Sequence, residues 1–109
     1  MDTAIGYGFG VRCDTASEPT LVSVHGELDA HTSREVLARV TERLAEAEGC
    51  VDLDLSAVTF LDSGGLRALA LLAALGSGRR GGLRLVDPSA PVRRVLALTG
   101  KSHRFTVAP

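Results

Sequence analysis

The sequence predicts a single α/β domain with the element order ββαβαβα, followed by a short last strand. Segments with strand-like patterns alternate with segments whose apolar residues recur at helical spacing, and turn-forming residues separate them. The chain has 109 residues, which suits one compact domain with a real core. Strands joined through a helix are therefore expected to run parallel, with right-handed crossovers.

The first elements are predicted to be a β-hairpin and a helix. Gly8–Ala16 and Thr20–Leu28 flank a turn that contains Pro19, and the second segment alternates apolar and polar residues. Asp29–Ser33 offers several N-cap candidates for an amphipathic helix over Arg34–Glu48. The apolar face of this helix consists of Leu37, Val40 and Leu44.

The middle of the chain predicts a half-covered strand and a buried helix. Val51–Leu55 alternates with period two, so that its apolar residues face one side while Asp52 and Asp54 face the other. Leu66–Leu75 is apolar nearly all round, which is typical of a mostly buried helix.

The last part of the chain continues the alternation of strands and helices. Leu83–Asp87 is predicted to be a strand, and the segment Pro88-Ser89-Ala90-Pro91 is expected to start a third helix. The apolar face of this helix would consist of Val92, Val95 and Leu96, and Arg104–Val107 can form a short last strand.

Composition argues against a membrane protein. Hydrophobic residues make up 45% and charged residues 23%, as in ordinary globular domains. The longest apolar stretch, Leu66–Leu75, contains Arg67 and has about half the length of a membrane crossing. The first residues show no basic segment followed by an apolar run, so no secretory signal is predicted and a cytoplasmic location is expected.

Nucleic-acid, metal and cofactor binding are not expected either. The net charge is −1, aromatic residues make up only 4%, and the basic residues are spread out apart from Arg79-Arg80 and Arg93-Arg94. Cys13 and Cys50 stand alone, which predicts reduced thiols and no metal site.

Two enzyme patterns fail on their context. The segment Gly76–Gly81 matches G-x-G-x-x-G, but it follows a predicted helix instead of opening one, so we interpret it as a turn. The series Gly6, Gly8 and Gly10 has no predicted strand before it. A hydrolase that uses Ser63 is the remaining enzyme hypothesis, although Leu61 stands where a nucleophile elbow has glycine. His25, His31 and His103 are interpreted as surface residues.

The polar segment Asp62-Ser63-Gly64-Gly65 lies where the middle strand meets the buried helix. One explanation is structural: Asp62 or Ser63 caps the helix, and the glycines relieve crowding against a neighbouring strand. The other is functional: bare backbone lets another protein approach closely, and Ser63 presents its hydroxyl at the helix start. A phosphate at Ser63 would bring a charge of about −1.5 to −2, which a helix N-terminus tolerates and an acidic or apolar partner surface does not.

Three segments resemble the STAS-domain anti-sigma factor antagonists of bacteria. Gly26–Ser33 is similar to the G-E-L-D stretch of that family, Val51–Leu66 to its strand and D-S-x-G-L phosphorylation loop, and Gly82–Gly100 to its next strand and helix. The resemblance implies a single STAS domain over residues 1–109, with a mixed β-sheet and helices packed on one side. The last helix of the family is expected to be absent or truncated.

The resemblance also implies a function that requires no catalysis by this chain. Ser63 would be phosphorylated by an anti-sigma factor that is a serine kinase, and a serine phosphatase would reverse the reaction. The unphosphorylated form would bind the anti-sigma factor and release a sigma factor. The implied partner-binding residues are Glu27, Asp29, Asp62, Ser63, Gly64, Gly65 and Leu66.

Gly64 departs from the family pattern, because many members have a second Ser or Thr there. Any second phosphorylation or hydroxyl contact at this position would be lost. A different hypothesis keeps the STAS fold without the switch: a constitutive protein-binding module in a signalling scaffold or a transport complex.

Overall fold

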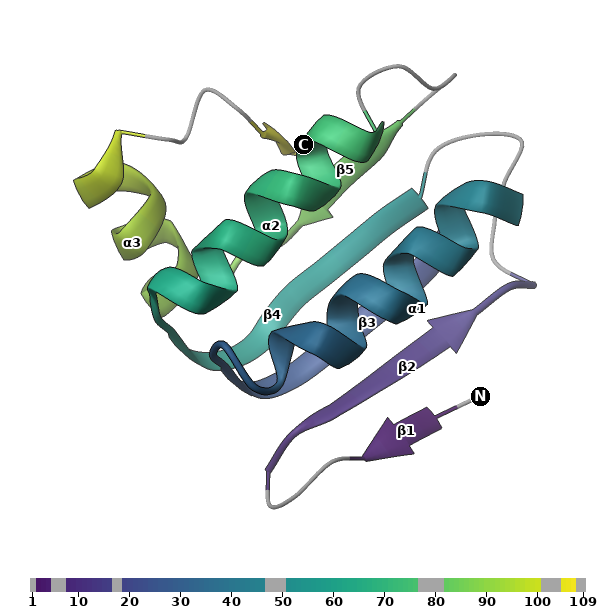
Figure 1. The fold of residues 1–109 in the computed structure, drawn as a ribbon, viewed down its shortest axis with the longest axis horizontal. Coiled ribbons are helices and arrows are strands. Elements are labelled where there is room, and N and C mark those ends of the chain that lie inside the picture. Colours follow the sequence, from purple (N-terminus) through teal and green to yellow (C-terminus); the bar gives the residue numbers. More distant parts are fainter. Residues whose placement is uncertain are drawn as a thin grey trace.

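The computed structural model describes residues 2–4, 8–16, 19–46, 51–76, 82–100 and 105–107, which form one six-stranded sheet and three helices. The strands lie in the sheet in chain order, and α1 and α2 lie side by side across one face of it (Figure 1). The strands are β1 Asp2–Ala4, β2 Gly10–Asp14, β3 Thr20–Leu28, β4 Val51–Leu61, β5 Leu83–Val86 and β6 Thr106–Val107. The helices are α1 Ser33–Glu46, α2 Ser63–Gly76 and α3 Ala90–Thr99.

The sheet is mixed, as expected. β2 and β3 pair antiparallel and form the predicted hairpin, whereas β3, β4, β5 and β6 pair parallel through the intervening helices. The first strand, β1, was not predicted, so the statement that no strand precedes the N-terminal glycines is wrong. With three residues, β1 is too short to show the period-two alternation of a strand. It is recognised as a strand only by its pairing with β2.

β4 is longer than the sequence pattern indicated, because it runs on from Leu55 to Leu61. Its pairing with β3 contains two irregularities, and at each of them β4 has one residue more than β3. Such bulges break the period-two alternation on which the prediction rested. They turn several consecutive residues of β4 outward, among them Ser56, Ala57, Thr59 and Phe60.

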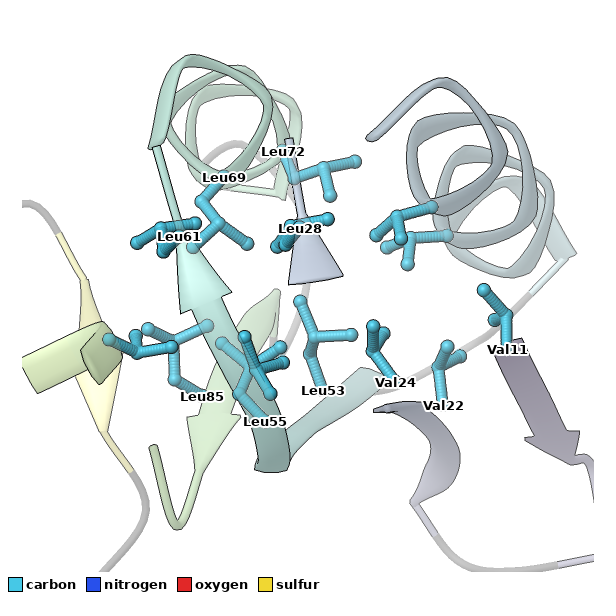
Figure 2. Close-up of a cluster of buried hydrophobic side chains, with 14 of the residues drawn as sticks. Val11, Val22, Val24, Leu28, Leu53, Leu55, Leu61, Leu69, Leu72 and Leu85 are labelled. Atoms are coloured by element: carbon cyan, nitrogen blue, oxygen red, sulfur yellow. The ribbon is translucent and has the colours of Figure 1, made fainter. Parts of the chain in front are cut away.

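The first half of β4 follows the predicted alternation and contributes to the core. Val51, Leu53 and Leu55 are fully buried. Asp52 lies on the other face as predicted but is also buried, because it forms a bidentate ion pair with Arg84 of β5, with both N–O distances 2.9 Å. Figure 2 shows the core side chains of the sheet meeting Leu69 and Leu72 of α2 in one apolar layer. The sheet and the two covering helices therefore form a single core.

The helices differ from the predictions in their exposure and their ends. α2 begins at Ser63, so both glycines lie in its first turn. It is less buried than predicted: the side chains of Leu71 and Leu75 are 49% and 53% exposed, because no element within the described ranges covers the outer side of the helix. None of the helices in the described part of the chain is long and apolar enough to cross a membrane.

α3 lies beside the second half of β4, where β5 has already ended. β5 pairs only with the first residues of β4, through Asp54. Beyond that point the Ser89 N–H donates to the Leu55 carbonyl (3.2 Å), and the Ser89 hydroxyl donates to the Val58 carbonyl (2.6 Å). The loop before α3 thus takes the place of a neighbouring strand.

Candidate partner-binding site

The candidate site begins at the junction of β4 and α2, where Asp62 is the helix cap. The Asp62 carboxylate accepts a hydrogen bond from the Gly65 N–H (2.9 Å), and the Asp62 carbonyl accepts the first helical bond from the Leu66 N–H (2.9 Å). This is the N-cap geometry that aspartate favours. Of the two cap candidates in the sequence, the structure therefore identifies Asp62, which leaves the Ser63 side chain unused as a cap.

Ser63 is the exposed first residue of α2. Its hydroxyl makes no hydrogen bond within the part of the chain that the structure describes. The first N–H groups of a helix have no partner in the helix itself, and the helix dipole favours negative charge at this end. The hydroxyl is thus accessible, and an anion attached to it would lie in a favourable local field.

Gly65 packs against the end of β3, and Gly64 packs against the loop that follows it. A Cβ on Gly65 would lie 2.3 Å from the Leu28 carbonyl oxygen, and a Cβ on Gly64 would lie 2.7 Å from the Cα of Ala30. Both contacts involve backbone, which cannot move aside cheaply. The structural explanation of the glycines, relief of crowding, is therefore confirmed. Gly65 and Leu66 are buried, and Gly64 is half-buried.

The loop between β3 and α1 is held together by Asp29 and Thr32. The Asp29 carboxylate accepts hydrogen bonds from the backbone N–H groups of His31 and Thr32, each at 2.9 Å. The Thr32 hydroxyl in turn accepts a bond from the Asp29 N–H (3.0 Å) and donates to the Glu27 carbonyl (2.7 Å). This reciprocal arrangement is a capping box. Asp29 thus has a structural role in the free chain.

The pKa of Asp29 is lowered from its ordinary value, chiefly because the Thr32 N–H donates a hydrogen bond to the carboxylate. The Thr32 hydroxyl and the His31 N–H act in the same direction. Hydrogen bonds to the charged form favour that form. The loop is therefore built around an ionised aspartate.

The two loops meet close to the end of the sheet. The Asp62 N–H donates to the Leu28 carbonyl (3.3 Å), which joins the end of β4 to the end of β3. Glu27 is exposed and lies opposite Phe60 in the pairing of β3 and β4. Four of the sequence-predicted residues share this end of the sheet and have exposed or partly exposed side chains: Glu27, Asp29, Asp62 and Ser63.

Phe60 is a candidate contact residue that the sequence analysis missed. Its side chain is 46% exposed although it directly precedes the buried Leu61. The signal was present in the sequence: two neighbouring large apolar residues in a strand cannot both face the core. Phe60 adds apolar surface two residues before Asp62.

Within the described residues, neither the histidines nor the metal-ligating side chains form an arrangement that supports the enzyme hypothesis. His25 and His31 are exposed, and no hydrogen bond joins either side chain to Ser63 in the described part of the chain. No group of three metal-ligating side chains lies together within those residues. Cys13 is buried and not in a disulfide.

Some predictions concern residues outside the described ranges. They are the predictions for Gly6, Cys50, the Arg79-Arg80 pair, the turn after Gly76 and His103.

Comparisons with known proteins point to one family. The family model described as "Mlab, STAS domain" matches residues 11–107 of this chain. A search of curated protein sequences gave no match. The chain is similar in structure to an anti-sigma factor antagonist from Mycobacterium paratuberculosis, with a TM-score of 0.78 and 27% identity over 98% of this chain and 91% of that chain.

Two structures of SpoIIAA show the same fold at lower identity. The anti-sigma factor antagonist SpoIIAA in its unphosphorylated form matches with a TM-score of 0.66 and 21% identity, over 91% of this chain and 88% of that chain. The Bacillus cell fate determinant SpoIIAA in the phosphorylated form matches with a TM-score of 0.57 and 21% identity, over 91% of each chain.

Proposed function

Because the chain belongs to the STAS domain family, we propose that it is an anti-sigma factor antagonist controlled by phosphorylation. In this proposal the unphosphorylated form binds a kinase-type anti-sigma factor, which then releases its sigma factor. Phosphorylation at Ser63 by the same kinase ends the binding, and a serine phosphatase restores it. The chain acts as a kinase substrate and a binding protein, in the cytoplasm.

The observation that carries the proposal is that Asp62, and not Ser63, caps α2. The Ser63 hydroxyl is exposed at the helix start, where it makes no hydrogen bond to any residue that the structure describes. A kinase can modify such a hydroxyl without breaking a hydrogen bond of the fold. The structural similarity to an antagonist from Mycobacterium paratuberculosis supports the same role, as does the existence of SpoIIAA in an unphosphorylated and a phosphorylated form.

The switch would act on the partner's surface more than on the fold. A phosphate brings about −1.5 to −2 charge, and the N-terminus of α2 tolerates it. The same charge beside the Asp62 carboxylate must be desolvated when a partner covers it, which is costly next to apolar or acidic groups. The contact surface in this proposal comprises Glu27, Asp29, Phe60, Asp62 and Ser63, with Gly64, Gly65 and Leu66 as its support.

Phosphorylation in solution tests the site assignment. The anti-sigma kinase is identified by a pull-down from the native cell extract and incubated with the chain and ATP. We expect one phosphate per chain, and none on the Ser63→Ala variant. Ser56→Ala is the matched control, because Ser56 is also exposed but lies within β4. Phosphate on a residue other than Ser63 would contradict the assignment.

A constitutive binding module is the second candidate. The packing of Gly64 and Gly65 against Ala30 and Leu28 favours it, because this packing explains the glycines without a switch. The two candidates differ in one measurement. A constitutive module binds its partner equally well as the native chain and as Ser63→Asp, whereas the proposed antagonist loses affinity.

A further inference from the structure

A shallow groove of about 270 Å³ runs between α1 and α2 from the end that carries Ser63. Small residues bring the two helices together at this end, since Ala30 and Gly64 are in close contact. We call this feature the α1–α2 groove. The residues that line it are Ala30, Ser33, Arg34, Leu37, Gly64, Arg67, Ala68 and Leu71.

Leucines give the groove an apolar floor that continues along α2. Leu37 is half-buried, and Leu71 is 49% exposed. Leu75 lies one turn beyond Leu71, on the same face of α2, and is also exposed. An apolar stripe of this kind, at helical spacing and without a covering element among the described residues, is suited to contact with another helix.

Two arginines flank this stripe, one from each helix. Arg34 and Arg67 are exposed, and neither has a carboxylate partner within the described residues. Other arginines of α1 are paired: Arg39 lies 3.7 Å from Glu35, and Arg43 contacts the carboxylates of Glu42 and Glu46. The groove lining contains no acidic side chain. Its charge is therefore positive, in a chain whose net charge is −1.

We propose that the α1–α2 groove is a docking surface for an acidic amphipathic helix of the protein partner. The leucines of such a helix would cover Leu37 and Leu71, and its carboxylates would pair with Arg34 and Arg67. The assignment of this helix to an anti-sigma factor rests on the proposed function. Arg67 lies four residues after Ser63 on α2, so a phosphate at Ser63 competes with the partner for this arginine.

The test uses two synthetic peptides and the intact chain, labelled with ¹⁵N. Each peptide has about 14 residues, the length of α2, with a leucine stripe at helical spacing. One peptide carries Glu on both sides of the stripe, and the other carries Lys. The acidic peptide is expected to shift the amide resonances of residues 30–37 and 64–71, and the basic one to leave them unchanged. Arg67→Glu is expected to weaken binding of the acidic peptide about tenfold.

Arg94→Glu is the matched control, because Arg94 is exposed on α3 and the change in net charge is the same. Equal weakening by both variants, equal binding of both peptides, or equal binding of a short oligonucleotide at the same residues would overturn the proposal. Peptide binding does not involve the kinase. If the chain binds the acidic peptide but is not phosphorylated on Ser63, the proposed function is refuted and the docking proposal stands. If the chain is phosphorylated on Ser63 but does not bind the acidic peptide, the docking proposal is refuted and the proposed function stands.

Discussion

Gly65 is the residue whose substitution should show most directly how tightly α2 packs against the end of β3. Alanine favours a helix over glycine by up to about 1 kcal/mol. Here its methyl group would meet the Leu28 carbonyl oxygen at 2.3 Å, and that oxygen belongs to the backbone. Gly65→Ala is therefore expected to lower the free energy of unfolding by about 1–3 kcal/mol in urea denaturation.

Ser63→Ala is the control for that measurement, because it changes the neighbouring exposed side chain in the same helical turn. The cap is Asp62, so loss of the Ser63 hydroxyl is expected to alter the free energy of unfolding by less than about 0.5 kcal/mol. Equal stability of Gly65→Ala and the native chain would contradict the close packing of α2 against the end of β3.

Asp29 should make the stability of the chain depend on pH in the acid range. Its pKa is lowered in the fold, so the ionised carboxylate stabilises the fold above the ordinary carboxyl pKa of about 3.9. This contribution is lost as the pH falls through the lowered pKa. Asp29→Asn removes the titrating group, so the variant should lose less stability between neutral and acid pH. Urea unfolding at a series of pH values measures this, and parallel curves for both chains would contradict it.

At the scale of the elements, β4 and α3 depend on each other through Ser89. The Ser89 hydroxyl donates to the Val58 carbonyl in the bulged part of β4, where β5 no longer pairs. Ser89→Ala leaves this half-buried carbonyl without that donor, and we expect a loss of about 1–2 kcal/mol in the free energy of unfolding. Ser56→Ala, on an exposed residue of the same strand, is the control and should be nearly neutral.

Hydrogen exchange locates the effect of Ser89→Ala. The amides of α3 and of the second half of β4 should lose protection together, because the Ser89 hydroxyl forms one of the two hydrogen bonds that join Ser89 to β4. Loss of protection in β2 or α1 instead would show that the substitution acts elsewhere.

Local patterns were sufficient to predict most elements. The period-two alternation of Val51–Leu55 and the helical spacing in α1 identified the central strand and the first helix, because one face of each is buried against the core. The patterns failed where the extent of a strand depends on backbone pairing and bulges. The bulges hid the second half of β4, and the short β1 is defined by pairing alone. Exposure of Leu71 could not be predicted, because it depends on which elements leave α2 uncovered.

The centre of the candidate site could be predicted from the sequence, whereas the contacts that surround it could be predicted only in part. The motif at Asp62–Gly65 identified the junction of β4 and α2, and a resemblance to a known family identified Ser63 as the residue to modify. Asp29 was among the predicted N-cap candidates, and its partner Thr32 is only three residues away, so this pair is local in the sequence. The contacts of the glycines required the fold, since they join α2 to Leu28 and Ala30, which a local pattern does not relate to it. The neighbouring pair Phe60-Leu61 indicated in the sequence that one of the two side chains is exposed, and the structure identifies it as Phe60.

At the scale of the whole molecule, binding should be centred on the end of the sheet that carries Ser63. Phe60 offers exposed apolar surface there, and aromatic anchors carry much of the energy of an interface. Phe60→Ala is expected to weaken binding of the anti-sigma partner by about tenfold or more, without a comparable loss of stability. Leu98→Ala, at an exposed site on α3, is the control and should bind normally. Equal effects of both variants on the affinity would argue against a surface centred on Ser63.

In the proposed function, a phosphate at Ser63 ends the binding of the partner while the fold stays intact. Isothermal titration calorimetry of the anti-sigma factor with the native chain and with the chain phosphorylated at Ser63 tests it most directly. Circular dichroism of both forms shows whether the fold is retained. We expect the same spectrum for both forms and a loss of affinity of at least about tenfold on phosphorylation, since a charge of about −1.5 to −2 must be desolvated at the interface. Equal affinity of the two forms would contradict the account.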